Sequence, residues 1–336
     1  MKDTRTLARL LAEPSTAAEV RDWTSVIAAA RAESLAGSLA WRLEGEKLPG
    51  EVEALLEAAR RDGEAARVQA LWEAEMARRA LAPLAIPVIL LKGTAYAAAG
   101  LDAARGRSIG DLDILVPREA LADVERALLA AGWEWVKEDP YDDQYYRRWM
   151  HELPPLIHRE RDRMIDVHHA ILPLTARPKP DMESMIESSV ELPDGLRVLH
   201  PADMIVHAAA HLFADGDLAG GLRNLWDIDR LVREFSGRGY DFTVELRERA
   251  WEHDLVPAVS RVLRAARALY GTRVDDRLAG PARPSDRLFL RRLLARDGWG
   301  RARRPVTRLG FYVRSHWLRM PPLMLARHLW VKARKG

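Results

Sequence analysis

The stretch that decides the fold is LLKGT at residues 90–94, followed after a short helical run by GRSIGDLDILV at residues 106–116. An apolar strand runs into a Lys-Gly-Thr turn, and a second apolar strand follows. Because successive side chains of a strand point to opposite faces, Asp111 and Asp113 are predicted to share a face. Neighbouring carboxylates repel each other, and a divalent cation such as Mg²⁺ relieves that repulsion. The backbone N–H groups of the turn suit a phosphate. The stretch therefore indicates a site for a metal-bound nucleotide.

A later segment, IDVHH at residues 165–169, supplies a third aspartate on a strand. The ordered set of Leu-Lys-Gly turn, Arg107, acid pair and third acid resembles the nucleotidyltransferase superfamily of the polymerase-beta type. It resembles more closely a bacterial family of uncharacterised nucleotidyltransferases, over roughly residues 20–235. The chain departs from the pattern at Thr94, where Gly or Ser is more usual, and at His169, where an aromatic residue is expected.

The resemblance implies Mg²⁺-dependent transfer of a nucleoside monophosphate from an NTP to a hydroxyl or phosphate of an acceptor. Asp111 and Asp113 would hold the metal on the nucleotide phosphates. Asp166 would complete a second metal site and help to deprotonate the acceptor. The expected nucleotide-binding residues surround these acids: Lys92, Gly93, Thr94, Arg107, Ser108 and His168.

Other interpretations of the same residues remain open. Each acid alone is typical of a solvated strand end, and each cation alone is typical of a protein surface. One alternative is a catalytically weak nucleotide-binding protein of the same fold, with a regulatory or interaction role. Another is a toxin-type nucleotidyltransferase that acts on RNA. The sequence selects neither the NTP nor the acceptor, which is a small molecule, a peptide or an RNA.

Three further pairs of residues have both a structural and a functional interpretation. His151 and Glu152 lie beside the predicted acid strand. His207 and His211 have the spacing of a metal site on a helix, with Asp215 beyond them. Arg223 and Asp227 suit an intrahelical ion pair or a role in the pocket.

Composition limits the class of protein. The 336 residues are 48% hydrophobic and 30% charged, which fits a globular protein with an ample core. The chain has no cysteine, which excludes thiolate metal sites and fits a reducing cytoplasm. The N-terminus lacks the apolar segment of a signal peptide, and no uncharged apolar run is as long as a membrane span.

The formal charge of +3 hides an uneven distribution. Residues 298–336 contain ten Lys and Arg and no acid, so the other residues carry 42 − 49 = −7. This basic tail also contains aromatic residues. It suits an anionic surface, either lipid headgroups or nucleic acid, or a helix packed on the domain with its arginines reaching solvent.

We therefore expect an α+β protein with four parts. Residues 1–83 form an N-terminal helical region with a long helix after Pro49, and residues 84–195 form a small mixed-sheet nucleotidyltransferase core. Its predicted strands are 86–91, 109–116, 133–136, 151–158 and 164–168. A C-terminal helical region, 196–297, and the basic tail, 298–336, follow.

Overall fold

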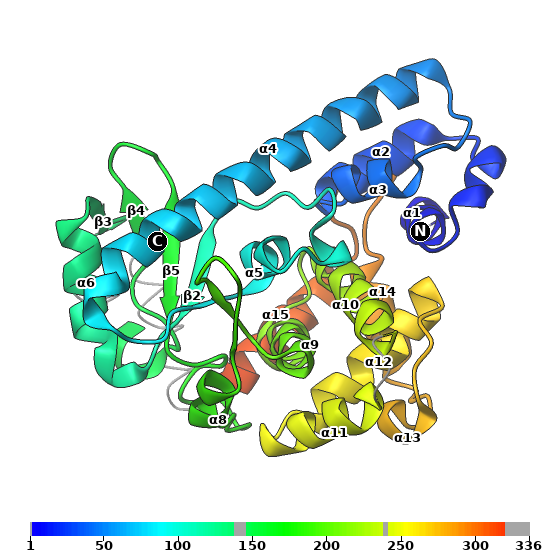
Figure 1. The fold of residues 1–336 in the computed structure, drawn as a ribbon. Coiled ribbons are helices and arrows are strands. Elements are labelled where there is room, and N and C mark those ends of the chain that lie inside the picture. Colours follow the sequence, from blue (N-terminus) through cyan, green and yellow to red (C-terminus); the bar gives the residue numbers. More distant parts are fainter. Residues whose placement is uncertain (1, 138–145, 238–240, 320–336) are drawn as a thin grey trace.

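The computed structural model describes residues 2–137, 146–237 and 241–319. A mixed sheet lies at one end of the molecule, and helical regions from both ends of the chain lie together at the other (Figure 1). The long helix α4 (Gly50–Leu81) connects the two ends. Among the described residues, no helix is long and apolar enough to cross a membrane.

The sheet has seven strands in the order β3-β4-β5-β2-β1-β7-β6. Its centre is a parallel pair, β2 (Leu112–Leu115) and β5 (Met164–His168), in which Asp113 lies opposite Asp166. β1 (Ile89–Leu90) pairs antiparallel with β2 on the other side. The remaining strands are β3 (Trp133–Trp135), β4 (Leu156–His158), β6 (Val190–Glu191) and β7 (Arg197–Val198).

Buried apolar residues fix this arrangement. Strand β2 is buried along its whole length, and Ile165 and Val167 of β5 are each 1% exposed. Fully buried central strands read as continuous apolar runs, which is why an aspartate inside β2 is unusual. Helix α6 (Leu121–Ala130) and one end of α4 pack near the sheet.

The N-terminal helices pack against α4 and against the C-terminal helices. Helix α3 lies along α4, and α1 contacts both α2 and the distant α12. The helices before the sheet are α1 (Lys2–Ala12), α2 (Trp23–Ala32) and α3 (Ala36–Arg42).

The C-terminal helices surround α10, which carries a buried face of twelve residues. Helix α9 continues directly into a π-helix, Ala210–Asp215. Apart from α6, the described α-helices that follow β1 are α5 (Lys92–Ala98), α8 (Met182–Glu187), α9 (Pro201–Ala209), α10 (Gly221–Ser236), α11 (Phe242–Glu252), α12 (Val256–Tyr270), α13 (Asp276–Ala279), α14 (Asp286–Leu293) and α15 (Pro305–Arg319).

The predicted α+β class, with a mixed sheet between helical regions, is confirmed. The prediction for 164–168 matches β5, but the strand predicted over 151–158 is wrong in extent. Only Leu156–His158 is a strand, and Glu152 forms a single bridge to His168, because Pro154 and Pro155 lack the N–H groups of a ladder. The sheet also continues past the expected boundary at residue 195, to β7. Residues 320–336 of the basic tail lie outside the described part.

A close contact between glycines joins the loop before Asp111 to the helices α3 and α4. Gly106 has φ +65°, and a Cβ placed on it would lie 2.2 Å from backbone atoms of Gly37 in α3. Gly63 lies inside the continuous α4 and also faces Gly106. Only glycine permits this backbone approach, which fixes the start of the loop that leads to Asp111.

Candidate active site

Three carboxylates meet at the centre of the sheet. Asp113 lies in β2 and is 3% exposed, Asp166 lies opposite it in β5, and Asp111 is exposed just before β2. One ligand atom from each of the three lies within 4.8 Å of the others. The parallel register of β2 and β5 therefore brings together acids that are about fifty residues apart in the sequence.

Two basic side chains hold the buried acid. The Lys92 ammonium donates to Asp113 Oδ1, and His168 Nε2 lies 2.9 Å from the same oxygen. Burial raises the pKa of Asp113, but Lys92 and His168 together lower that pKa well below its usual range. The carboxylates of the site in turn raise the pKa of Lys92, against the effect of burial. This ion pair is charged at neutral pH.

Asp166 has the opposite electrostatic environment. Burial and the nearby carboxylates of Asp113 and Glu152 raise the pKa of Asp166 to about 7. Among the described residues, neither a cation nor a hydrogen-bond donor contacts this side chain directly. The site therefore combines a permanently ionised acid with one that gains or loses a proton near neutral pH.

The donor set fits a hard divalent cation. Mg²⁺ and Ca²⁺ prefer oxygen ligands, and two oxygens that share one Mg²⁺ at about 2.1 Å lie at most about 4.2 Å apart. Small side-chain adjustments would bring the three carboxylates into that range. Lys92 neutralises one of the three negative charges, so the cluster keeps an excess that favours a cation.

Arg107 reaches the site from the loop before β2. Its guanidinium pairs with Asp227 of α10, which also binds Arg223 at 2.9 Å through Nε. The predicted intrahelical pair of Arg223 and Asp227 is present, and both side chains are buried. Two guanidinium groups thus share one carboxylate, so the three side chains together carry a net positive charge beside the start of α5.

Glycine at position 93 allows Arg107 to occupy this place. A Cβ on Gly93 would lie 2.4 Å from Arg107 Nε and 3.2 Å from Ile109 Cγ1. Arg107 Nε is buried and has no hydrogen-bond partner among the described residues. The Nε–H group of Arg107 is therefore an unused hydrogen-bond donor next to the Lys-Gly-Thr turn.

The other two predicted nucleotide-binding residues differ in their surroundings. Thr94 is 1% exposed, and its Oγ1 has no hydrogen-bond partner in the described chain. Ser108 is exposed and lines a cavity of about 280 Å³ beside α3 and α4, together with Gly37 and Gly63. None of the three acids lines that cavity, so the structure does not bring Ser108 together with them.

Glu152 and His151 extend the site behind His168. His168 Nδ1 lies 3.4 Å from Glu152 Oε2, so this imidazole connects Glu152 to Asp113. The rings of His151 and His168 stack at 5.3 Å, and burial lowers the pKa of His151 well below its usual value. The sequence placed Glu152 and His151 beside the acid strand and left both a structural and a functional interpretation open. In the structure, the Glu152 carboxylate lies against the imidazole of His168 and can hold its orientation.

His207 and His211 lie close to these groups but do not form a metal site with them. Burial lowers the pKa of His207 well below its usual value and lowers the pKa of His211 to about 3. No metal-ligating group of three among the described residues includes either histidine. They agree with the interpretation as a packed pair. The side chain of Asp215 lies outside the described part.

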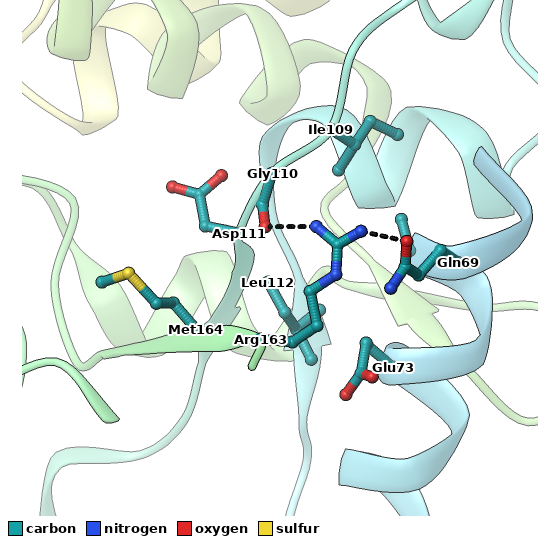
Figure 2. A pocket seen from close by; sticks show the side chains of 9 residues that line it. Gln69, Glu73, Ile109, Gly110, Asp111, Leu112, Arg163 and Met164 are labelled. Carbon is teal, nitrogen blue, oxygen red and sulfur yellow. Dashed lines mark hydrogen bonds between the residues drawn. The ribbon is translucent and has the colours of Figure 1, made fainter. Parts of the chain in front are cut away.

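Arg163 was not identified from the sequence, where it belongs to a charged turn between two strands. Figure 2 shows that it holds the loop before Asp111 against α4. It donates to the Gly110 carbonyl at 3.3 Å and to the Gln69 side chain, while the Asp111 carboxylate points away from it. Arg161 of the same turn pairs with Glu73 of α4 at 2.9 Å. A turn that contacts a helix some ninety residues earlier gives no signal in the local sequence.

Comparison with known proteins agrees with this arrangement. The sequence pattern of a family described as uncharacterised nucleotidyltransferases matches residues 19–271, which include the sheet, all three acids and most of the C-terminal helices. The chain belongs to this family. No curated protein matches the chain with significance. As a nucleotidyltransferase-family protein, it combines the acid cluster with a Lys-Gly-Thr turn, and its assignment to a transferase class rests on that family.

Proposed function

We propose that the protein is an Mg²⁺-dependent nucleotidyltransferase, which moves a nucleoside monophosphate from an NTP to a hydroxyl or phosphate oxygen of an acceptor. The observation that carries this proposal is the convergence of Asp113 and Asp166, on two parallel strands, with Asp111 just before the first of them. Their excess negative charge beside Lys92 and Arg107 suits a metal-bound triphosphate, which presents both a cation and phosphate oxygens.

The two strand acids, Asp113 and Asp166, would have different roles in the reaction. When bound, Mg²⁺ would stabilise the charge on the attacking and leaving oxygens. Asp113 is ionised at neutral pH and would serve as a ligand, whereas Asp166, with a pKa of about 7, would accept the proton of the acceptor. The acceptor oxygen forms a bond to the α-phosphorus as the bond to the bridging oxygen breaks, and pyrophosphate leaves with that electron pair.

Residues of the turn would bind the triphosphate. Gly93 lets the chain approach closely, and the Thr94 hydroxyl has no other partner among the described residues. Arg107 would contribute its spare Nε donor, and Lys92 would share its charge between Asp113 and the phosphates. Such a reaction belongs in the cytoplasm, where NTPs are available and where a cysteine-free chain needs no disulfide.

Calorimetric titration with ATP, GTP, CTP and UTP, with and without Mg²⁺, tests the proposal. We expect one NTP to bind in an Mg²⁺-dependent manner. The double variant Asp111→Asn, Asp113→Asn should lose this binding entirely, while its circular dichroism spectrum stays unchanged. Asp123→Asn, which alters an exposed acid on α6, is the matched control and should bind as the unmodified protein does.

Two results would contradict the proposal. Absence of binding to every NTP would make the sheet a scaffold without a nucleotide site. Equal binding by the double variant would place the nucleotide elsewhere. If a labelled NTP is incorporated into added RNA, the acceptor is RNA, and the toxin-type interpretation replaces a small-molecule or peptide acceptor.

A further inference from the structure

Helix α15 (Pro305–Arg319) has two apolar faces, and only one of them is buried. On the inner face, Phe311 packs edge-on against Phe289 of α14, with ring centroids 5.2 Å apart. Arg314 donates to the Phe213 carbonyl of the π-helix at 2.7 Å. These contacts fix the orientation of α15 on the body of the protein.

The outer face presents large apolar side chains to solvent. Val306 is 82% exposed, Leu309 62%, Val313 52% and Trp317 46%. Their spacing of three, four and four residues places them along one side of a helix, on the side opposite Phe311. Four aligned apolar residues at such exposure form a continuous stripe, here called the outer stripe, and contiguous apolar stripes of this kind mark interaction sites.

The charge around the outer stripe selects the partner. Residues 298–336 contain ten Lys and Arg and no acid, whereas the rest of the chain carries a net charge of −7. Arg301, Arg303 and Arg308 are exposed close to the start of α15, and their guanidinium groups form no ion pair among the described residues. A partner for this surface must therefore be anionic and must also accept aliphatic side chains.

We infer that the outer stripe docks the protein on an anionic lipid surface. Three of its four residues are aliphatic, which suits acyl chains and gives no platform for stacked nucleotide bases. No helix of the described residues is long and apolar enough to cross a membrane, and the inner face of α15 is packed on the body of the protein, so α15 lies along the surface. The stripe enters the acyl boundary, and the arginines bind headgroup phosphates. This inference does not depend on the proposed reaction.

Vesicle flotation of the full-length protein tests the inference. We expect binding to vesicles that contain phosphatidylglycerol, weaker binding at high salt, and little binding to pure phosphatidylcholine. The double variant Leu309→Asp, Val313→Asp should bind roughly tenfold or more weakly, because two apolar side chains no longer enter the lipid. Both side chains are exposed, so the melting temperature should not change.

Trp251→Asp is the matched control. Trp251 is the most exposed tryptophan of the described chain, at 79%, and it lies on α11, away from the outer stripe. Its replacement should leave vesicle binding unchanged. Quenching of tryptophan fluorescence by lipids brominated on the acyl chain should occur in the unmodified protein and should decrease in Trp317→Tyr.

Four results would overturn the inference. The first is absence of binding to either vesicle, and the second is equal binding by the Leu309→Asp, Val313→Asp variant. The third is self-association in light scattering that this variant abolishes, which would make the stripe an interface between two copies. The fourth is binding only after removal of residues 320–336, which would show that this segment covers the stripe in the intact chain.

Discussion

Asp113 and Asp203 are two buried aspartates with similar direct neighbours and very different surroundings. Asp203 of α9 is fully buried and accepts hydrogen bonds from Arg249 Nε at 2.8 Å, from Ser188 at 3.1 Å and from His253 Nε2 at 3.2 Å. Burial raises the pKa of Asp203, but His253 and Arg249 lower it below its usual value. Asp113 also pairs with one cation and one histidine.

The clusters around Asp113 and Asp203 differ in their net charge. The Asp203 carboxylate is satisfied by donors that join α8, α9 and α11, so this cluster holds helices together. Around Asp113, two more carboxylates converge, and Lys92 and His168 are the basic side chains that the described residues place against them. A buried ionic cluster that is balanced stabilises the fold, whereas one that keeps an excess of one sign favours a ligand of the other sign.

Single substitutions should separate these two roles most strongly. Asp203→Asn removes the fully buried carboxylate that Arg249 and His253 share and should lower the free energy of unfolding by about 3–5 kcal/mol. Asp113→Asn also removes the carboxylate that Lys92 and His168 share, but it relieves the repulsion with Asp166. It should therefore lower the free energy of unfolding by less than Asp203→Asn does, yet abolish Mg²⁺-dependent nucleotide binding. Urea unfolding and calorimetry measure both effects. Comparable destabilisation by the two variants would mean that the acid cluster is structural.

The sequence predicts one of these clusters and not the other for a physical reason. Alternation along the strands placed Asp111 with Asp113, and Asp166 with His168, on common faces, and the observed register of β2 and β5 brings these faces together. Strand periodicity is local, so the sequence reveals it. Asp203 lies in an ordinary helical pattern, and its partners come from segments that only the tertiary fold brings near.

The same limit applies within the site. The spacing of Arg223 and Asp227 predicts their ion pair, but not that Asp227 also binds Arg107, which is 120 residues away. The short hairpin of β6 and β7 was missed because two-residue strands have no detectable alternation, although Gly195, with φ +81°, marks its turn. Ser108 is adjacent to Arg107 in sequence, but it lies on the opposite side of the loop, at a cavity beside α3 and α4.

Gly93→Ala tests the contact between Arg107 and the turn, and its effect should be smaller than that of Asp113→Asn. The added Cβ would lie 2.4 Å from Arg107 Nε, so the guanidinium must move away from the Lys-Gly-Thr turn. We expect nucleotide affinity to fall roughly tenfold, the contribution of one charge-assisted hydrogen bond. Gly50→Ala has no atom within 4 Å of the new Cβ and is the matched control. Unchanged affinity in Gly93→Ala would exclude Arg107 from nucleotide binding.

The most specific predicted effect is the pH dependence that Asp166 gives to the acid cluster. Its pKa of about 7 lies above the value of an unfolded aspartate, so between about pH 4 and pH 7 the folded protein binds a proton that the unfolded chain does not. This contribution stabilises the fold at low pH and is lost as the pH rises through 7. Mg²⁺ binds the ionised carboxylate, so metal affinity should change in the opposite direction.

We therefore expect Mg²⁺ affinity to rise about tenfold per pH unit below pH 7 and to level off above it. Thermal melts with and without Mg²⁺ should show a larger increase in melting temperature at pH 8 than at pH 6. Asp166→Asn should remove this difference, because asparagine does not titrate. Asp203→Asn should keep it, because the pKa of Asp203 is lowered rather than raised and this carboxyl does not titrate near neutral pH. If Asp166→Asn retains the full pH dependence, the proton belongs to another group, and Asp166 is not the acid that distinguishes this cluster from the one around Asp203.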